Sequence, residues 1–324
     1  MEIFRLTLSQ MLMMFSLIIA GFVLRKKNLV PENSYITLSK LELFVFSPAL
    51  AFHNQLVKCN VKTFLENSRL ILYGLGVILV AMVVGYFLSG VFVRNASADE
   101  KTAYQRNIYK YSLTFSNYGF MGNFIVLGVW GADMFYKYSL FTFFVAIFCS
   151  SYGLYILIPK GKGASIGQNL KKGLLAPPMV ALVLGIICGL LNLGQYFPAF
   201  AISALENASN CMGPVAMLLA GIVIGGYDFG ELIKNKKVYV VSLVRLIVLP
   251  AIFIMALKFI GADKELLTLA LITFATPLGM NTIVYPAAYG GDTKTGASMT
   301  MISHVLSVIT IPIMYLIFIV WLSI

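Results

Sequence analysis

Long apolar runs alternate with short polar stretches along the whole chain. Each run approaches the roughly 20 predominantly apolar residues that cross a bilayer as an α-helix. The connections between them are short and carry most of the charged residues, which is typical of a bundle of membrane helices. The pattern predicts ten spans, at residues 6–24, 35–56, 69–93, 105–129, 134–158, 174–193, 197–225, 238–259, 265–288 and 296–322.

The fourth and ninth runs repeat one another. Thr114 recurs as Thr273, and Asn123 recurs as Asn281 at an offset one position shorter. Because each copy holds five spans, an odd number, the second copy enters the membrane upside down, as in the inverted repeats of transporters. The predicted repeats are residues 1–159 and residues 160–324.

Both of these runs contain helix-breaking residues in the middle. The first holds Ser-Asn-Tyr-Gly at 116–119, and the second holds Thr-Pro-Leu-Gly at 276–279. Glycine and proline are the poorest helix formers. Unwound chain at mid-membrane depth is tolerated only inside protein or beside a water-filled cavity. We therefore expect the breaks in spans 4 and 9 to face each other, and paired broken spans point to the substrate site of a secondary transporter.

Four prolines lie well inside other predicted spans, away from the span ends. A proline removes one backbone hydrogen bond and clashes with the preceding turn, although membrane helices contain it more often than soluble ones. We expect bends at Pro48, Pro214, Pro250 and Pro312.

Composition agrees with an all-α integral membrane protein. The chain is 59% hydrophobic and 11% charged, with a mean hydropathy of +0.87, and this is more apolar surface than one water-soluble core hides. The net charge of +11 is spread over alternating connections rather than over one face. The expected surroundings are a lipid bilayer, and nucleic acid is not an expected partner.

Lysine and arginine are unevenly divided between the two sides of the predicted bundle. Fifteen lie near span ends on one side, at Arg25, Lys26, Lys27, Arg94, Lys101, Arg106, Lys110, Lys160, Lys162, Lys171, Lys172, Lys234, Lys236, Lys237 and Lys294. Seven lie on the other side, at Arg5, Lys58, Lys62, Arg69, Lys137, Lys258 and Lys264. The side richer in lysine and arginine is expected to be cytoplasmic, so both termini are predicted on the extracytoplasmic side. The expected location of the protein is the cell membrane.

The breaks provide an anion-binding device without charged side chains. The second half of a broken helix begins with free N–H groups that carry about half a positive charge, so two such ends supply roughly one. Amides, a hydroxyl and glycines there add hydrogen-bonding groups and permit close approach to the backbone. The candidate substrate-binding residues are Asn117, Tyr118, Gly119, Gly122, Asn123, Pro277, Gly279, Asn281 and Thr282. Alternatively, the asparagines cap the broken helices and the glycines only allow close packing.

Four acidic or basic side chains also lie well inside predicted spans, away from the span ends. A charge at mid-span costs about 3 kcal/mol on insertion scales, so each needs a partner, a cavity or a route to the interface. Arg245 either contacts the substrate or snorkels to the interface. Glu42 and Glu206 occupy comparable places in the two copies and are candidates for coupling or for structural contacts. His304 is a candidate carrier of a coupling proton or a hydrogen-bonded packing residue.

No catalytic or metal-binding motif occurs in the sequence. The cysteines are scattered singly, and no phosphate loop, nucleophile elbow or Cys/His metal pattern is present. We expect no enzymatic activity, no catalytic residue, no metal site and no cofactor.

The residues at both breaks resemble those of the auxin efflux carrier family, and the resemblance extends over essentially the whole chain. The segments at 116–122 and 275–281 carry it. In the first, Asn117 is followed by Met-Gly four and five residues on; in the second, proline is followed four residues on by Asn281. The chain departs from the family at Phe124, where relatives usually carry a proline.

This resemblance implies both an architecture and an activity. Spans 1, 2, 6 and 7 would form a scaffold that dimerises, and spans 3–5 and 8–10 a transport domain whose broken helices cross at the substrate. The implied activity is elevator-like secondary transport of a small organic anion, a mono- or dicarboxylate such as malate, malonate or auxin.

Three other functions are open at this point. A sodium-coupled carrier of the bile-acid type would need acidic ligands near the breaks, and neither broken segment contains a cluster of them. A membrane-embedded ligand sensor usually needs an output domain, for which these runs leave little length. An anion channel would need a ring of charged pore residues.

Overall fold

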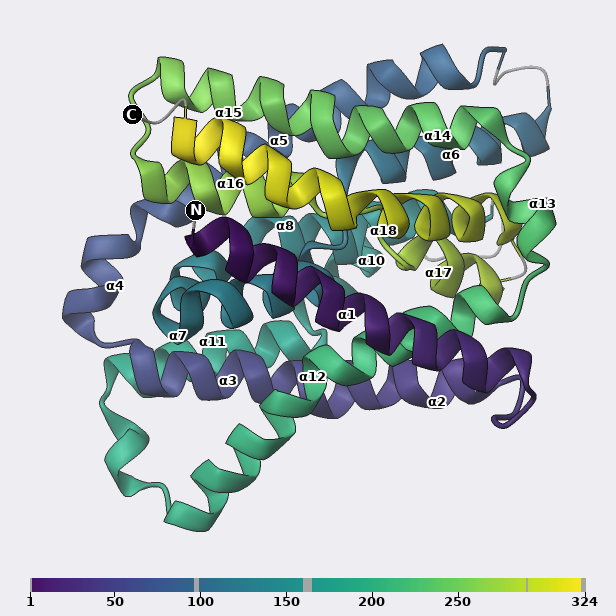
Figure 1. The fold of residues 1–324 in the computed structure, drawn as a ribbon. Coiled ribbons are helices and arrows are strands. Elements are labelled where there is room, and N and C mark those ends of the chain that lie inside the picture. Colours follow the sequence, from purple (N-terminus) through teal and green to yellow (C-terminus); the bar gives the residue numbers. More distant parts are fainter. Residues whose placement is uncertain (1, 96–98, 160–164, 290, 322–324) are drawn as a thin grey trace.

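The computed structural model consists of helices joined by short connections (Figure 1). It describes four stretches of the chain, residues 2–95, 99–159, 165–289 and 291–321. Within these stretches there is no strand, and one isolated antiparallel bridge joins Ser116 to Leu278. The chain folds as an all-α membrane protein.

The helices of the first half are α1 (Glu2–Lys26), α2 (Ser34–Leu41), α3 (Ser47–Lys58), α4 (Val61–Asn67), α5 (Arg69–Phe92), α6 (Glu100–Thr114), α7 (Asn123–Phe141), α8 (Phe143–Phe148) and α9 (Leu154–Leu157). Three π-helical segments lie among them, η1 (Glu42–Phe46), η2 (Tyr118–Gly122) and η3 (Cys149–Gly153). The helices of the second half are α10 (Ile166–Leu174), α11 (Pro177–Leu190), α12 (Ala199–Gly225), α13 (Phe229–Ile233), α14 (Lys236–Leu243), α15 (Leu249–Phe259), α16 (Lys264–Ala275), α17 (Asn281–Tyr289) and α18 (Lys294–Tyr315). The 3₁₀ segment η4 (Leu193–Tyr196) and the π-helical segments η5 (Val244–Val248) and η6 (Leu316–Trp321) complete this half.

Six helical stretches of the described chain are long and apolar enough to cross a membrane. They are Phe4–Lys26, Ser34–Lys58, Val61–Phe92, Ala199–Gly225, Lys236–Phe259 and Lys294–Trp321, and they correspond to the first, second, third, seventh, eighth and tenth predicted spans. A seventh results if the pair Tyr118–Phe141 and Phe143–Leu157, bent by 55°, counts as one. The sixth predicted span contains only the shorter helix α11, and the ninth is divided into α16 and α17. Ten spans therefore stays a prediction.

The turn between the fourth and fifth predicted spans lies at Gly131. This residue has φ +76° and ψ −171°, which interrupts the helical path of α7. L side chains rarely adopt such a conformation, and glycine adopts it without strain. Gly290, which follows Gly131 at the same offset as Thr273 follows Thr114, lies outside the described residues.

Two of the four prolines directly follow π-helical segments. Segment η1 ends two residues before Pro48, and η5 ends two residues before Pro250. Because proline has no N–H, the carbonyl one turn earlier lacks its usual partner, and a widened turn accommodates the change. Helices α12 and α18 instead continue through Pro214 and Pro312.

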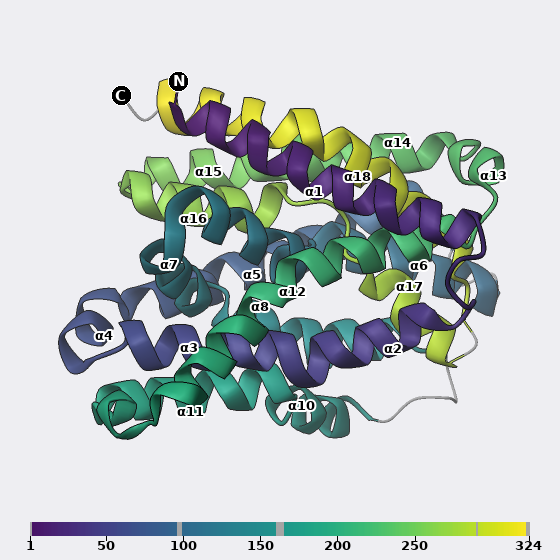
Figure 2. The same ribbon diagram turned by 60° about the horizontal axis from the view of Figure 1, so that its bottom comes forward.

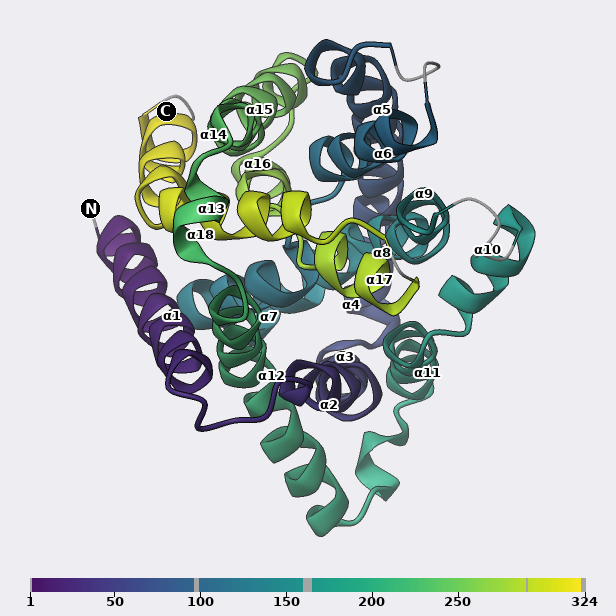
Figure 3. The ribbon, with the colours of Figure 1, turned by 90° about the vertical axis from the view of Figure 1, so that its right-hand side faces the viewer.

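The helices pack in two groups, which touch where α1 runs beside α18 (Figures 2 and 3). In one group α1 packs along α12, and α3 packs along α11. In the other, α5 packs on α6, α14 on α18, and α15 on α16. Helix α7 lies between the groups and contacts α1, α3 and α5, so the interrupted fourth span touches both sides.

Helices α1 and α12 touch backbone to backbone. A Cβ atom added to Gly221 would lie 2.0 Å from the carbonyl oxygen of Ile18, and one added to Gly21 would lie 2.2 Å from that of Leu218. Small residues allow membrane helices to approach this closely. Neither glycine can gain a side chain without separating the pair.

Candidate substrate-binding site

The two broken spans cross inside the bundle and are joined by hydrogen bonds. The N–H of Asn117 donates to the carbonyl oxygen of Pro277 at 2.7 Å. The Ser116 hydroxyl donates to the carbonyl oxygen of Thr273 at 2.6 Å and accepts from the Thr276 hydroxyl at 2.8 Å. Each break thus supplies partners for backbone groups that the other exposes, as unwound chain in a membrane requires.

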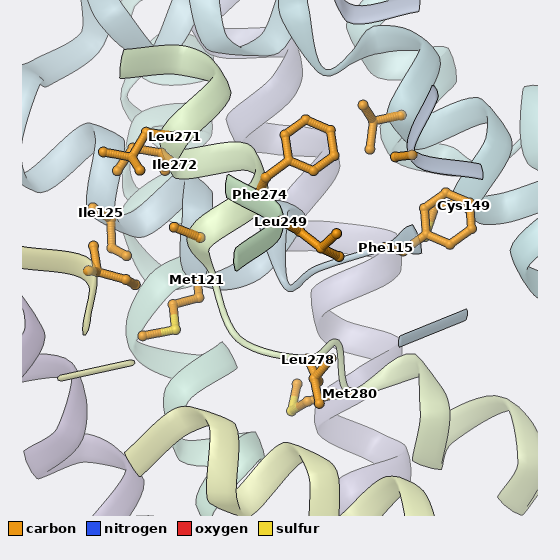
Figure 4. Packing of buried hydrophobic residues seen from close by; sticks show 14 of the residues in the cluster. Phe115, Met121, Ile125, Cys149, Leu249, Leu271, Ile272, Phe274, Leu278 and Met280 are labelled. Carbon is orange, nitrogen blue, oxygen red and sulfur yellow. The ribbon is translucent and has the colours of Figure 1, made fainter. Parts of the chain in front are cut away.

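Apolar side chains pack around the unwound segments. Figure 4 shows the chain passing from Phe274 through Leu278 to Met280, with Met121 and Ile125 nearby. All five of these side chains are at most 1% exposed. The crossing is therefore held by packing as well as by hydrogen bonds.

A cavity of about 260 Å³ adjoins the crossing. Tyr118, Gly119 and Phe120, the first residues of η2, line it, and so do Gly279, Met280 and Asn281, where the chain leads into α17. Side chains of α2, η1, α3, α11 and α12 also line the cavity, among them Ser39, Glu42, Leu50, Met179, Leu182 and Leu219. The cavity is mainly apolar and has polar groups at the crossing, which is typical of small-molecule sites.

The candidate residues from the sequence divide into two sets around this cavity. Those that line it are Glu42, Asn117, Tyr118, Gly119, Asn123, Gly279 and Asn281. Those that lie outside its lining are Gly122, Pro277, Thr282, Arg245, Glu206 and His304.

His304 of α18 holds the side chain of Asn117. The amide nitrogen of Asn117 lies 3.2 Å from Nε2 of His304, and Nδ1 of His304 lies 2.7 Å from the carbonyl oxygen of Thr300. If Nδ1–H donates to that carbonyl, Nε2 is left as the acceptor for the amide. His304 thereby orients a cavity residue without lining the cavity itself.

Tyr111 and Cys149 hold the side chain of Asn281. Its amide nitrogen donates to the Tyr111 hydroxyl at 2.9 Å and to the Cys149 sulfur at 3.6 Å. The Tyr111 hydroxyl and the Cys149 sulfur are 3.1 Å apart. Sequence reasoning missed both residues, because neither belongs to a repeated motif.

The three candidate glycines serve different purposes. A Cβ on Gly122 would lie 2.3 Å from the Tyr138 hydroxyl, and one on Gly279 would lie 3.3 Å from the carbonyl oxygen of Ser116. A Cβ on Gly119 would meet nothing within 4 Å. Gly122 and Gly279 therefore allow close packing, whereas Gly119 leaves space beside the cavity.

Two backbone carbonyl groups near the breaks, those of Gly279 and Tyr118, accept hydrogen bonds from side-chain hydroxyls. The Thr282 hydroxyl donates to the carbonyl oxygen of Gly279 at 2.9 Å. The carbonyl oxygen of Tyr118 accepts from the Tyr138 hydroxyl at 3.1 Å. These bonds satisfy part of the irregular backbone. The Asn117 side chain itself makes no cap hydrogen bond to η2.

Arg245 binds the end of α6 and is wholly buried. Its Nη1 donates to the carbonyl oxygen of Leu113 at 3.0 Å and lies 3.5 Å from that of Thr114. Its guanidinium carbon lies 5.5 Å from the centre of the Phe274 ring. A cation at the C-terminal end of a helix is favourable, and an aromatic face adds to the attraction. The Arg245 side chain therefore stays inside the bundle and does not reach the membrane interface by snorkelling.

Glu42 and Glu206 have different surroundings despite their comparable places in the sequence. Glu42 is wholly buried, and neither of its carboxyl oxygens has a hydrogen-bond partner among the described residues. Glu206 is exposed on α12. The structure does not place them in equivalent contacts.

Phe124, where the chain departs from the pattern of its relatives, packs on Gly213 of α12. A Cβ on Gly213 would lie 1.8 Å from the Phe124 ring, so the ring sits directly against the α12 backbone. The carbonyl oxygen of Phe124 accepts from the Gln10 amide of α1 at 3.4 Å. The fourth span is interrupted at residues 115–122 without this proline.

No metal site is evident in the described part of the chain. Nowhere within it do three or more His, Cys, Asp or Glu side chains gather in a way that would hold a metal ion.

Comparison with protein-family models matches residues 6–315, nearly the whole chain, to a family described as membrane transport protein. No curated protein is similar enough to the chain to count as a match.

Proposed function

Because the chain belongs to the membrane transport protein family, the family of the auxin efflux carriers, we propose that it is a secondary transporter of a small organic anion. Members of this family are membrane transporters, and the apolar helices make this chain a multi-pass membrane protein. The anion, the location in the cell membrane and the mode of movement belong to the proposal.

One observation carries the choice of substrate class. The N-terminal ends of both second half-helices and the side chains of Asn117 and Asn281 line one cavity. Each helix end contributes about half a positive charge, so together they suit a single carboxylate. The lining residues include no lysine or arginine in the described part of the chain.

The proposed mechanism is elevator-like movement within a five-plus-five inverted repeat. Residues 1–159 and 160–324 form the two copies. Spans 1, 2, 6 and 7 form the scaffold, and spans 3–5 and 8–10 form the transport domain. Close packing of α1 on α12 and of α3 on α11 favours a rigid scaffold.

Polar contacts join the proposed scaffold to the proposed transport domain. Lys58 of α3 pairs with Asp133 of α7 at 2.8 Å, and the Gln55 amide donates to the Ser139 hydroxyl at 2.5 Å. Relative movement of the two domains would break these contacts and expose the cavity to the opposite side.

The proposed orientation places the termini outside the cytoplasm and the connection near residue 165 inside it. Lys160 and Lys162, on which part of this orientation depends, lie outside the described residues. The cavity reaches Ser150 and Ala176, on either side of that connection. In this orientation the structure represents a cytoplasm-facing state, and a homodimer through the scaffold helices completes the proposal.

A thermal-shift screen of the purified protein against mono- and dicarboxylates tests the substrate class. A ligand that binds only the folded protein raises its melting temperature by mass action. Flux of a hit into vesicles that contain the protein, with and without a sodium gradient, then tests transport. Binding without flux would indicate a sensor, sodium-dependent flux a bile-acid-type carrier, and channel-like conductance an anion channel.

A further inference from the structure

Glu42 is a buried carboxyl group without a partner at the candidate cavity. It is the first residue of η1, none of its surface is exposed, and both carboxyl oxygens lack a hydrogen-bond partner among the described residues. It lines the cavity together with Asn117 and Asn281. π-Helical turns inside α-helices are frequent at functional sites.

The elements packed around Glu42 place no cation against it. Segment η1 contacts α2, α3, α11 and α12. The titratable side chains of these helices are Tyr35 and Lys40 on α2, His53 and Lys58 on α3, Cys188 on α11, and Glu206 and Cys211 on α12. Lys40 is exposed, Lys58 pairs with Asp133, and His53 interacts electrostatically with Glu206. The other titratable groups that line the described cavity are Tyr118, Cys149 and Tyr285.

A carboxylate in this position needs compensation when an anion binds. An unpaired charge within a span costs about 3 kcal/mol on insertion scales, and a second negative charge in the same cavity adds repulsion. A proton on the carboxyl group removes its charge and converts an acceptor into a hydrogen-bond donor. Protonated Glu42 is thus able to donate to a substrate carboxylate.

We infer that Glu42 binds one proton together with the substrate anion, so that a carboxylate enters the cavity only when Glu42 is protonated. This inference rests on the proposed function and adds protonation of one scaffold residue as a condition for substrate binding. Where Glu42 of the empty cavity is deprotonated, one proton enters with one monoanion, and the net charge of the cavity is unchanged.

Calorimetric titration of purified protein with benzoate, indole-3-acetate, malonate and malate tests the inference. For the wild type, affinity should stay constant while Glu42 of the empty cavity is protonated. As the pH rises further, up to about 10, affinity should fall by up to about tenfold per pH unit, because binding then takes up a proton. Glu42→Gln cannot titrate but keeps an N–H donor, so its Kd should be nearly independent of pH. Glu206→Gln alters an exposed carboxylate outside the cavity and should keep the wild-type dependence.

Several outcomes would overturn the inference while leaving the proposed function intact. They are pH-independent binding by the wild type, retention of its pH dependence by Glu42→Gln, and loss of binding by a folded Glu42→Gln at every pH. The last result would mean that the negative charge itself is needed, as for a ligand with a cationic group. Failure of all four acids to bind any of the proteins at any pH would overturn the proposed function as well.

A second measurement decides the matter if Glu42→Gln does not fold. Titration of the wild type in buffers of different ionisation enthalpy counts the protons taken up with each anion. At the highest pH at which the anion still binds, uptake of one proton per anion supports the inference, and uptake of none overturns it.

Discussion

The backbone N–H of Asn117 donates a hydrogen bond to the carbonyl oxygen of Pro277 at 2.7 Å. This bond joins the two broken spans at the points where each leaves its helix. A backbone N–H or carbonyl group that one break leaves without a helical partner is therefore hydrogen-bonded by the other break. Each break depends on the other for this partner.

Replacing either cavity asparagine is expected to weaken substrate binding. Asn117→Ala and Asn281→Ala each remove an amide that would hydrogen-bond the substrate. Leaving a buried polar group of the substrate unpaired costs about 1–3 kcal/mol. Both proteins should still purify, and calorimetry on the best carboxylate of the screen gives the change in affinity. Asn67→Ala, on α4 outside the cavity lining, is the control. If both variants bind with wild-type affinity, the asparagine side chains only hold the two breaks in place, and the site lies elsewhere.

Tyr111→Phe is expected to act through Asn281. The variant loses the hydroxyl that accepts from the Asn281 amide, so affinity should fall by about 1 kcal/mol. In a double-mutant cycle, Tyr111→Phe should have little further effect once Asn281 is alanine. Additive effects would mean that Tyr111 acts independently of the asparagine. Tyr73→Phe, at a side chain 37% exposed, controls for loss of a hydroxyl.

Arg245 is expected to affect all substrates alike. Lysine keeps the charge but loses the planar fork, and glutamine loses both, so binding should decrease in the order wild type, Arg245→Lys, Arg245→Gln. Hydrogen bonds to charged groups contribute about 1.5–3 kcal/mol. Because Arg245 binds the end of α6 and does not line the cavity, malonate and benzoate should lose affinity by the same factor. A larger loss for malonate would indicate direct contact with a second carboxylate.

The ion pair between Lys58 and Asp133 is expected to favour the cytoplasm-facing state. Asp133 is exposed, and pairs of this kind contribute about 0.2–1 kcal/mol, so Asp133→Asn should shift the equilibrium only a few-fold. With Cys149 as the single cysteine, its labelling by an impermeant reagent from outside intact cells should become faster. Combining Lys58→Asp with Asp133→Lys should restore the original rate. No change in either protein would exclude a role for the pair in the equilibrium.

The orientation in the membrane is expected to place α10 in the cytoplasm. In a background without native cysteines, a cysteine at Lys171 should resist an impermeant reagent in intact cells, whereas one at Lys62 should react. Both positions are exposed, so labelling after permeabilisation confirms that each is reactive. The opposite pattern would reverse the orientation.

The residues that recur between the fourth and ninth predicted spans allowed the place of the candidate site to be predicted. The matching of Thr114 with Thr273, and the helix breakers that follow each, predicted two interrupted spans that meet, and the structure joins Ser116 to Leu278 at that place. Hydropathy predicted the all-α membrane fold, which the long apolar helices and the family match confirm. These features are readable because they depend on local composition and on comparison within the chain.

Other features depend on which helix faces meet, and local sequence does not contain that information. Glu42 and Glu206 occupy comparable places in the two predicted copies, yet one is buried and the other exposed. Tyr111 and Cys149 reach Asn281 from distant parts of the chain. Arg245 offered two interpretations until its contact with the end of α6 was visible.

The packing of the Phe124 ring against Gly213 has a consequence for the proposed movement of the transport domain. One turn of helix advances about 5.4 Å, and one turn away from Gly213 along α12 stand Ser209 and Met217. A ring displaced along α12 in either direction therefore meets a side chain where it had met none. In the proposed elevator movement, Gly213 would act as a notch in α12 that gives the transport domain one preferred position, or stopping point, relative to the scaffold. A methyl group in the notch, as in Gly213→Ala, should shorten the dwell time at that point in single-molecule recordings, and an unchanged dwell time would rule the notch out.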